Sequence, residues 1–370
     1  MIISGGGTGG HIYPAIAIAN ALKGIDNNIE VLFVGAKDRM EMQKVPAAGY
    51  KIEGLWISGI QRRLTLDNLM FPFKVISSVL KAKRILRGFK PDIAVGVGGY
   101  ASWPLLYAAN SMNIPTLIQE QNSYAGVTNK ALARKAKRIC VAYQEMDKFF
   151  PKEKIMLTGN PVRKDILDYQ SKRDEAFKFF HLDSTKRTVL VIGGSLGART
   201  INESISAKLS MFTDAGVQVI WQTGKLYVEK AKALVEESGN SSIKVFDFIS
   251  RMDYAYAAAD VVISRAGALS ISELCLVSKP AVLVPSPNVA EDHQTKNAMA
   301  LVNADAAQMI KDQAAVQVLV PAALKLLQDE EKKKFFRENI KKLGKPDAAN
   351  TIAREVIEIM KEYRSLKFKA

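Results

Sequence analysis

Short apolar runs rich in valine and isoleucine alternate along this chain with longer segments of helical periodicity. The first half contains six such runs, at residues 1–3, 30–34, 93–97, 116–119, 138–142 and 155–157. A second series follows at residues 188–192, 218–222, 244–246, 261–264, 281–285 and 307–310. Strands that alternate with helices indicate parallel sheets wound by helices, so the pattern predicts an α/β protein with two such sheets.

A turn-forming segment, Gly159-Asn160-Pro161-Val162-Arg163, separates the two series and is followed by a polar stretch. We therefore expect a first domain over residues 1–161 and a second over residues 162–345. A final helix is expected at about residues 348–366, because Gly344-Lys345-Pro346-Asp347 combines a stop signal with a capping aspartate. Periodicity alone leaves open which domain this helix joins.

Length and composition favour a globular protein of two domains. The chain has 370 residues, of which 48% are hydrophobic, and only two cysteines, Cys140 and Cys275. Neither cysteine has a second cysteine or a histidine at metal-ligand spacing, which favours a reducing compartment and argues against a zinc site. The glycine loop that begins at Gly5 leaves no room for a signal peptide, and no window approaches the ~18 to 20 apolar residues that span a bilayer. We expect a soluble or peripheral protein.

Basic residues outnumber acidic ones by 52 to 37, a formal net charge of +15, and much of the excess lies in two places. Residues 61–90 carry eight basic side chains and one acid, and residues 332–370 carry twelve basic and five acidic side chains. Nucleic acid and an anionic membrane are the partners that such patches favour. Solvated helix faces would explain the same charges without a partner.

Each series opens with a strand that runs into glycines, first Ser4-Gly5-Gly6-Gly7-Thr8-Gly9-Gly10-His11 and then Gly193-Gly194-Ser195-Leu196-Gly197-Ala198. Glycine allows a tight turn, and the following helix offers N–H groups to an anion, so each loop is a candidate phosphate cradle. Close packing of strand and helix is the structural alternative. Gly5, Gly7 and Gly10 also match the dinucleotide fingerprint, but the second strand ends in Gly35-Ala36-Lys37 without the acid that would hold a ribose. An NAD or FAD enzyme is therefore disfavoured.

Two further polar segments follow strands of the first series. These are Gly98-Gly99-Tyr100 and Glu120-Gln121-Asn122. The carboxyl ends of parallel strands meet at one edge of a sheet, where ligands bind in open α/β folds. We therefore expect these segments to converge with the first glycine loop.

Eight short blocks spread over nearly the whole chain carry a more specific signal: Gly6 to His11 with Pro14, Gly98 to Tyr100, Glu120 to Asn122, Thr128 to Lys130, Gly159 to Arg163, Gly193 to Arg199, Arg265 to Glu273, and Asp292 to Gln294 with Asn297. Their residues and their order resemble the MurG glycosyltransferases. Ala266 and Ser270 depart from the commonest family residues, but both keep the site small, so the donor is expected to be unchanged.

The resemblance implies the GT-B fold, in which two Rossmann-like domains face each other across a cleft and a final helix, here residues 346–370, crosses back to the first domain. It implies transfer of N-acetylglucosamine from UDP-GlcNAc to the 4-hydroxyl of the N-acetylmuramyl sugar of lipid I, with inversion, giving lipid II and UDP. It further implies peptidoglycan synthesis at the cytoplasmic face of the inner membrane, and with it a part in cell shape and division.

The resemblance also implies which residues bind the substrates. On the donor side it assigns Arg163 and Ser195 to the diphosphate and nucleotide, the backbone of Ile249 to the uracil, and the helix start Ala268-Leu269-Ser270-Ile271-Ser272 to the phosphates. Glu273 would hold the ribose hydroxyls and Gln294 the sugar hydroxyls. Thr8, Gly9, Gly10 and Asn122 would complete the donor and acceptor side, and Gly99 and Tyr100 would lie on the acceptor side.

The chemistry requires a base for the acceptor hydroxyl and positive charge for the leaving diphosphate. His11 is one candidate base, because a helix N-terminus disfavours the protonated imidazole, and Glu120 is the other. Either could instead be structural, His11 by orienting the acceptor and Glu120 by bonding loop amides. No Asp-x-Asp occurs in the chain, so we expect no essential metal or other cofactor, with the charge supplied by Arg163, amide groups and a helix dipole.

Apolar and basic residues are interleaved between residues 66 and 87, as in a segment that lies at a membrane interface. We expect Phe71, Phe73 and Lys74 to dock on an anionic leaflet, since each basic residue near such a surface adds on the order of 1 kcal/mol of attraction. An ordinary amphipathic helix packed on its own sheet is the alternative.

Two other classes of protein remain to be weighed against the transferase. A UDP-sugar epimerase or hydrolase of the same two-domain build would act without an acceptor. A nucleic-acid-binding protein would use the positive charge for phosphates, but the basic segments lack interleaved stacking aromatics, so no nucleic-acid partner is expected.

Overall fold

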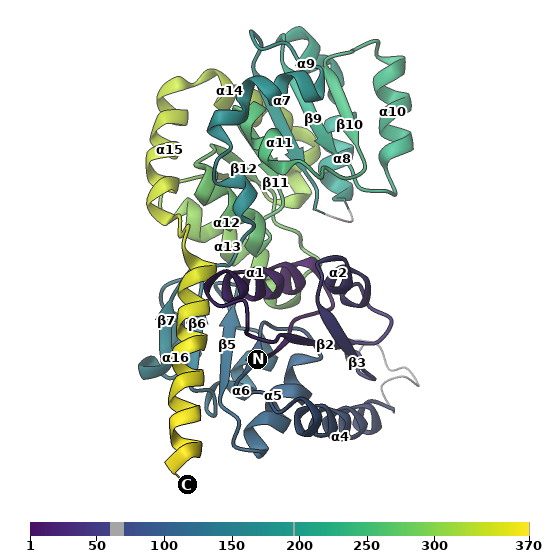
Figure 1. The fold of residues 1–370 in the computed structure, drawn as a ribbon. Coiled ribbons are helices and arrows are strands. Elements are labelled where there is room, and N and C mark those ends of the chain that lie inside the picture. The colour runs from purple at the N-terminus through teal and green to yellow at the C-terminus, as the bar shows by residue number, and fades with distance from the viewer. Residues whose placement is uncertain (60–69, 195–196, 370) are drawn as a thin grey trace. The chain divides into compact units, whose positions relative to one another are not determined.

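The computed structural model describes residues 1–59, 70–194 and 197–369 (Figure 1). The chain divides into two compact units, Met1–Arg163 with Asp347–Ala370, and Lys164–Pro346. Each unit is a parallel sheet with helices on its faces. The expectation of an α/β protein built on two parallel sheets is confirmed.

The first unit contains a seven-stranded sheet in the order β3-β2-β1-β4-β5-β6-β7, with every neighbouring pair parallel. Its strands are β1 (Ile2–Ser4), β2 (Leu32–Ala36), β3 (Lys51–Leu55), β4 (Ala94–Gly96), β5 (Thr116–Glu120), β6 (Arg138–Val141) and β7 (Ile155–Leu157). The winding reverses between β1 and β4, which are neighbours in the sheet. Such a reversal leaves a crevice at the carboxyl ends of the strands, where open α/β sheets bind ligands.

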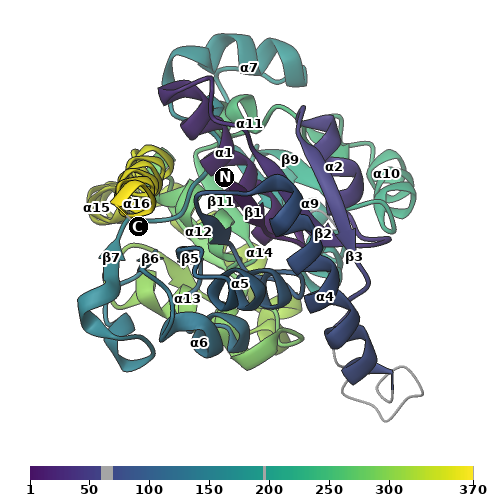
Figure 2. The same cartoon turned by 60° about the horizontal axis from the view of Figure 1, so that its bottom comes forward.

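Helices cover both faces of this sheet. One apolar core joins it to α1 (Gly9–Ile25), α2 (Glu41–Ala47) and α16 (Ala348–Lys369), and another joins it to α4 (Phe71–Phe89), α5 (Ser102–Ser111) and α6 (Val127–Ala133). Short 3-10 turns follow at Met146–Lys148 and Lys152–Lys154. Figure 2 shows α4 and α5 side by side.

The last helix, α16, belongs to the first unit although it follows the second in sequence (Figure 1). Its apolar side chains recur at helical spacing, with Ile352, Val356 and Met360 buried in the core that contains α1. Burial of each such side chain contributes about 1.5–3 kcal/mol. Ion pairs reinforce the contact, and one joins Arg138 to Glu355 over 2.6 Å. The helix is thus an integral part of the first unit.

The second unit contains a six-stranded parallel sheet in the order β10-β9-β8-β11-β12-β13. Its strands are β8 (Thr188–Ile192), β9 (Gln218–Gln222), β10 (Ile243–Phe246), β11 (Val261–Ser264), β12 (Ala281–Leu283) and β13 (Gln308–Met309). The reversal of winding falls between β8 and β11. Each sheet therefore has the same kind of switch point beside its first strand.

The helices of the second unit are α7 (Arg173–Phe180), α8 (Arg199–Ser206), α9 (Leu209–Asp214), α10 (Val228–Glu237), α11 (Met252–Ala258), α12 (Ala268–Val277), α13 (His293–Val302), α14 (Ala315–Gln328) and α15 (Glu330–Leu343). Its 3-10 turns are Lys164–Ile166, Gln170–Lys172, Ala290–Asp292 and Asp312–Ala314. One large core joins the sheet to α8, α9, α14 and α15. No helix in the described part of the chain is long and apolar enough to cross a membrane.

Strand β3 is the element that the apolar pattern missed. Its sequence, Lys-Ile-Glu-Gly-Leu, is buried only at Gly54 and Leu55 and lies at the edge of the sheet, where Lys51 and Glu53 are exposed. Edge strands need no continuous apolar run, because only one face of them contacts the core. Each of the twelve apolar runs that were expected to be strands overlaps one of the other strands of the structure.

Candidate active site

The loops after β1, β4 and β5 meet at the carboxyl edge of the first sheet. The N–H group of Val97, after β4, donates to the Ser4 carbonyl over 2.7 Å, and the hydroxyl of Ser102 donates to the same oxygen over 3.0 Å. Gln121, after β5, donates from its side-chain amide to the Val97 carbonyl over 2.6 Å. The predicted convergence of these segments is confirmed.

His11 lies in the first turn of α1, close to the glycine loop. Its Nδ1 atom is 3.1 Å from the Gly6 carbonyl oxygen and 3.3 Å from Thr8 Oγ1. Because a carbonyl oxygen can only accept, the contact with Gly6 requires a proton on Nδ1, and the lone pair of the neutral ring is then on Nε2. The Nε2 side of the ring contacts Gly98, where an added Cβ would lie 2.8 Å from that nitrogen.

The turn after β4 needs both of its glycines. Gly98 and Gly99 have φ values of +97° and +87°, and an added Cβ at Gly99 would lie 2.3 Å from the Gly6 carbonyl oxygen. Any side chain there would separate the turn from the first loop. Tyr100, which follows, is 52% exposed and lies beside Gly59. Gly99 and Tyr100, the residues expected on the acceptor side, therefore lie at the same edge of the sheet as His11.

Glu120 is buried and bound by several hydrogen-bond donors. Its Oε1 atom accepts from the backbone and the side chain of Asn122, over 3.1 and 3.3 Å. Its Oε2 atom accepts from the Gly126 N–H group and from the Asn129 side chain, each over 2.9 Å. This is the geometry of a carboxylate that shapes the loop carrying Asn122, which favours His11 over Glu120 as the base.

Helix α4 exposes an apolar stripe, defined by Phe73, Ile76 and Leu80, which are 63, 60 and 63% exposed. Lys74 lies on the opposite side of the helix, with its Nζ atom 3.3 Å from Ser58 Oγ. Its burial contradicts the expectation that it contacts a membrane, and Phe71 is only partly exposed and packs against the core. Residues 66–69 of the expected interfacial segment lie outside the described residues.

The second glycine loop follows β8 at the corresponding edge of the second sheet. Gly197 has a φ of +79°, and an added Cβ there would lie 2.0 Å from the Thr223 carbonyl oxygen. The side-chain amide of Gln222, at the end of β9, donates to the Gly194 carbonyl over 2.9 Å. Neutral groups thus anchor this loop. Ser195, expected near the nucleotide, lies outside the described residues.

Helix α12 begins at the same edge, directly after β11. Gly267 precedes it, and its first turn contains no acidic residue. The helix therefore presents its positive end and its first N–H groups at the switch point, as a phosphate site requires. The expected phosphate contacts form the first part of this helix: Ala268, Leu269, Ser270, Ile271 and Ser272.

Three of the remaining donor-side residues, Ile249, Glu273 and Gln294, follow strands β10, β11 and β12 of the same sheet. Glu273, on α12, accepts from the Tyr256 hydroxyl over 2.9 Å, and Gln294 accepts from the Ser286 N–H group over 2.9 Å. Ile249 is buried in the segment after β10. Arg163 is exposed and ends the first unit. The structure thus gathers Ile249, Glu273 and Gln294 at the carboxyl edge of one sheet.

Sequence reasoning missed two residues of these sites, Tyr256 and Glu41. Tyr256 is fully buried and orients Glu273, but nothing in its local sequence indicates that contact. Glu41, in the first turn of α2, is also fully buried and accepts from the N–H groups of Gly7 and Ala36, over 2.9 and 3.0 Å. An acid therefore does reach the tip of the second strand, but its oxygens bind backbone rather than a ribose.

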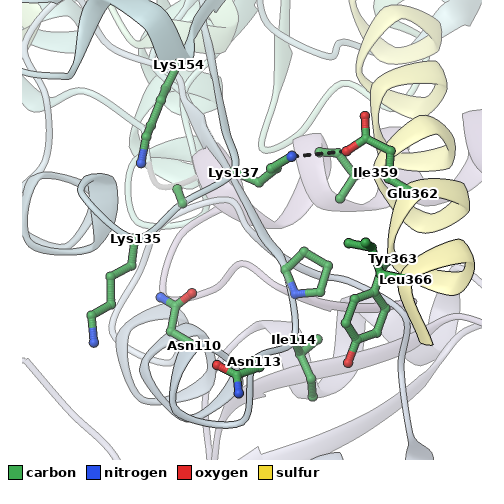
Figure 3. Close-up of a pocket in the computed structure, with 12 residues that line it drawn as sticks. Asn110, Asn113, Ile114, Lys135, Lys137, Lys154, Ile359, Glu362, Tyr363 and Leu366 are labelled. Atoms are coloured by element: carbon green, nitrogen blue, oxygen red, sulfur yellow. Dashed lines mark ion pairs between the residues drawn. The ribbon is translucent and has the colours of Figure 1, made fainter. Parts of the chain in front are cut away.

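A separate pocket of about 610 Å³ lies in the first unit, away from these residues (Figure 3). Pro115, Lys137 and Lys154 line it just before β5, β6 and β7, so it opens at the amino ends of the strands. Across it, Lys137 forms an ion pair with Glu362 of α16 over 3.1 Å. Because the switch point is at the opposite ends of the strands, this pocket is not the candidate active site.

The chemistry open to the two sites is narrow. Cys140 and Cys275 are buried, and burial raises the pKa of each thiol to about 12, which excludes a thiolate nucleophile at neutral pH. Within residues 1–59, 70–194 and 197–369, no group of three or more histidine, cysteine, aspartate or glutamate side chains is placed to hold a metal ion. The geometry supports two roles for these sites: proton transfer at His11 and anion binding at the amino end of α12.

Comparison with known proteins shows the family of this chain. Residues 1–141 match the N-terminal domain of glycosyltransferase family 28, and residues 188–352 match its C-terminal domain. A Cytophaga hutchinsonii protein named UDP-N-acetylglucosamine–N-acetylmuramyl-(pentapeptide) pyrophosphoryl-undecaprenol N-acetylglucosamine transferase is 61% identical over 360 residues, which cover 97% of this chain and 96% of the relative. The chain belongs to the MurG family of glycosyltransferases.

Other MurG relatives agree in sequence and in structure. A Parabacteroides distasonis transferase of the same name is 58% identical over 97% of this chain and 98% of its own length. The crystal structure of Acinetobacter baumannii MurG matches with a TM-score of 0.74 and 28% identity, covering 96% of this chain and 99% of that one. The chain therefore has the GT-B type of fold, with a Rossmann-like domain in each unit, as the motifs of the MurG family predict.

Proposed function

We propose that this protein transfers N-acetylglucosamine from UDP-GlcNAc to the 4-hydroxyl of the N-acetylmuramyl sugar of lipid I, giving lipid II and UDP. The observation that carries the proposal is the 61% identity, over 97% of the chain, with a relative named for that transfer. The two sites support it, because one presents an oriented imidazole and the other presents a helix N-terminus and a carboxylate, Glu273, that accepts from the Tyr256 hydroxyl.

His11 acts as the base. The acceptor oxygen forms a bond to the anomeric carbon while the bond from that carbon to the UDP oxygen breaks, and the hydroxyl proton passes to Nε2 of His11. Attack opposite the leaving group inverts the anomeric centre. The contact of Nδ1 with the Gly6 carbonyl supports this role, because it fixes the ring and places the lone pair on Nε2.

The second unit holds the donor. The diphosphate binds the amino end of α12 and the second glycine loop, with Arg163 and Ser195 as further contacts. Glu273 binds the ribose hydroxyls, the backbone of Ile249 reads the uracil, and Gln294 binds the sugar. Thr8, Gly9, Gly10 and Asn122, in the first unit, are further proposed substrate contacts. The contact of Tyr256 with Glu273 supports this arrangement, because it fixes one carboxylate oxygen and orients the group.

The leaving UDP is stabilised without a metal ion in this proposal. Arg163, backbone N–H groups and the dipole of α12 provide the positive charge. We expect full activity in EDTA. A loss of activity that Mg²⁺ or Mn²⁺ restores would refute a metal-independent site.

The protein works at the cytoplasmic face of the inner membrane, where α4 docks on anionic lipid. The exposed stripe of Phe73, Ile76 and Leu80 enters the interface, and Arg84 and Arg87, exposed further along the helix, face the headgroups. Interfacial helices combine apolar and basic faces in this way.

Sedimentation with anionic vesicles tests the docking surface. A variant with Phe73→Ser, Ile76→Ser and Leu80→Ser should bind vesicles at least about tenfold more weakly, because burial of each apolar side chain contributes about 1.5–3 kcal/mol. Leu226→Ser is the matched control, since Leu226 is 97% exposed in the second unit. Equal binding by the triple variant and the wild type would refute the surface.

Release of UDP from UDP-GlcNAc, with and without a lipid I analogue, tests the reaction itself. The transferase releases UDP only with the acceptor present. Release without the acceptor would favour a hydrolase or an epimerase that leaks UDP. Formation of the disaccharide product must match the UDP released.

A further inference from the structure

The peptide unit between Gly6 and Gly7 is held from both sides. Its carbonyl oxygen contacts His11 Nδ1 over 3.1 Å, and its N–H group donates to Glu41 Oε2 over 2.9 Å. One rigid, planar group thus joins a buried carboxylate to the imidazole that acts as the base. This arrangement resembles a carboxylate and histidine pair with a peptide inserted between them.

Two glycines make the space that the Glu41 side chain occupies. An added Cβ at Gly6 would lie 2.2 Å from Glu41 Oε1, and one at Gly35 would lie 2.5 Å from its Cγ. The second oxygen, Oε1, accepts from the Ala36 N–H group at the end of β2 over 3.0 Å. The carboxylate is therefore fixed against both the first loop and the sheet, in a fitted site.

Burial of a carboxylate costs free energy unless hydrogen bonds compensate. Glu41 is fully buried and receives two backbone N–H groups, so it cannot touch a substrate. A hydrogen bond from a peptide N–H group to a carboxylate also polarises the peptide, which makes the carbonyl at its other end a stronger acceptor. That carbonyl is the one that orients His11.

We propose that Glu41 is a positioning residue for His11 and acts through the Gly6–Gly7 peptide. It fixes the plane of that peptide, holds the proton of His11 on Nδ1, and strengthens Nε2 as a base. The inference rests on the proposed role of His11 in the transfer. A residue that orients a catalytic base raises the reaction rate, because an oriented base stays in the productive geometry more than a mobile one does.

Titratable side chains on elements that meet at this edge include Tyr13 on α1, Tyr100 after β4 and Glu120 at the end of β5. Others are Lys23 on α1, Lys37, Asp38 and Arg39 after β2, Lys44 on α2, Tyr107 on α5 and Tyr124 after β5. Both oxygens of Glu120 bind donors in its own loop. Glu41 is the carboxylate that shares a peptide unit with His11.

The experiment combines kinetics with NMR on Glu41→Gln. We expect kcat to fall about 10- to 100-fold, as is usual when a group that orients a functional residue is lost, with little change in KM for UDP-GlcNAc. The chain has only three histidines, so labelled imidazole signals can be assigned. In the variant, His11 should titrate at lower pH, because the negative charge that favours the protonated ring is gone, and its Nδ1–H tautomer should be less populated.

Glu41→Asp and Glu53→Gln complete the test. Glu41→Asp keeps the charge on a shorter side chain, so its effects should have the same direction and a smaller size. Glu53 lies on the surface strand β3, where it pairs with Lys81 over 3.6 Å, and Glu53→Gln should leave kcat, KM and the His11 signals unchanged.

An unchanged His11 titration and tautomer in a folded Glu41→Gln variant would overturn the inference. If that variant does not fold, the same result in Glu41→Asp would overturn it. His11→Ala tests the proposed function separately: full activity in that variant would refute the base role, whereas the NMR result would still decide whether Glu41 acts on His11.

Discussion

The two glycine loops of this protein occupy the same position in their sheets, after β1 and after β8, but they are held by different groups. In the first loop, the Gly7 N–H group donates to the buried carboxylate of Glu41. In the second, the Gly194 carbonyl accepts from the neutral amide of Gln222. A phosphate would meet a negative charge and an occupied amide at the first loop, whereas the described contact of the second loop, at Gly194, is with a neutral amide.

The two loops have similar glycine-rich sequences, but the different charges of the groups that bind them indicate two different functions. In our proposal the first loop orients an imidazole for proton transfer, and the second, with the amino end of α12, binds the donor's diphosphate. We therefore expect local charge at a loop, rather than the number of its glycines, to decide whether it binds phosphate. Substitutions at each loop should therefore affect different steps of the reaction.

The largest effect is expected from His11→Ala. Loss of a general base should lower kcat about 10²- to 10⁴-fold, while KM for UDP-GlcNAc changes little, because the donor's diphosphate is assigned to the other loop. Steady-state UDP release with a lipid I analogue measures both constants. A raised KM with an unchanged kcat would contradict the assignment of the first loop to chemistry.

Gln222→Glu would give the second loop the kind of charge that the first one has. A carboxylate there would face the Gly194 carbonyl and repel the diphosphate, so the Kd for UDP should rise at least about tenfold, which corresponds to about 1.4 kcal/mol. Titration calorimetry measures the change. Glu41→Gln is the counterpart in the first loop and should leave the Kd for UDP unaltered. Equal effects of the two variants would remove the distinction between the loops.

Tyr256→Phe should have a smaller effect, confined to donor binding. The variant loses the hydroxyl that orients Glu273, so KM for UDP-GlcNAc should rise by about 3- to 10-fold at unchanged kcat. Tyr254→Phe is the matched control on the same helix, because that hydroxyl donates instead to the exposed Glu175 over 2.7 Å. If both variants behave alike, Tyr256 does not act through Glu273.

The smallest effect on activity is expected at a buried charge remote from the loops. Lys279, just before β12, is buried and donates to the Ala259 carbonyl, and burial lowers the pKa of its ammonium group to about 7. Between pH 7 and its ordinary pKa of 10.5 the unfolded chain binds this proton and the folded chain does not, so the free energy of unfolding rises with pH.

Lys279→Met should remove that rise, with a difference from the wild type of about 1–3 kcal/mol between pH 7 and 9.5. Urea unfolding at the two pH values measures it, and kcat should stay the same. An equal pH dependence in both proteins would mean that Lys279 is charged in the folded state. A changed kcat would mean that a buried charge remote from the loops also affects catalysis.

The sequence predicted what depends on periodicity and topology. Continuous apolar runs marked twelve strands, and parallel topology then placed the first glycine loop, His11 and Glu120 at one edge of the first sheet. The exposed edge strand β3 was missed because Lys51 and Glu53 interrupt its apolar pattern. The resemblance to MurG added the donor residues, which no local pattern marks.

Contacts between distant residues were beyond prediction. Glu41 begins a short helix, and nothing near it indicates that its carboxylate turns back to Gly7. The inward position of Lys74, by contrast, had a signal. Ser78, Ala82 and Leu86 follow it at intervals of four and form the buried face of α4, so the helical period itself placed Lys74 on that face.

A crystal structure of the protein with UDP would test the central claim most directly. The claim predicts the diphosphate at the amino end of α12 and the second glycine loop, with the Gly7 N–H group still bound to Glu41. A diphosphate on the first loop, with the Glu41 carboxylate displaced from Gly7, would contradict it.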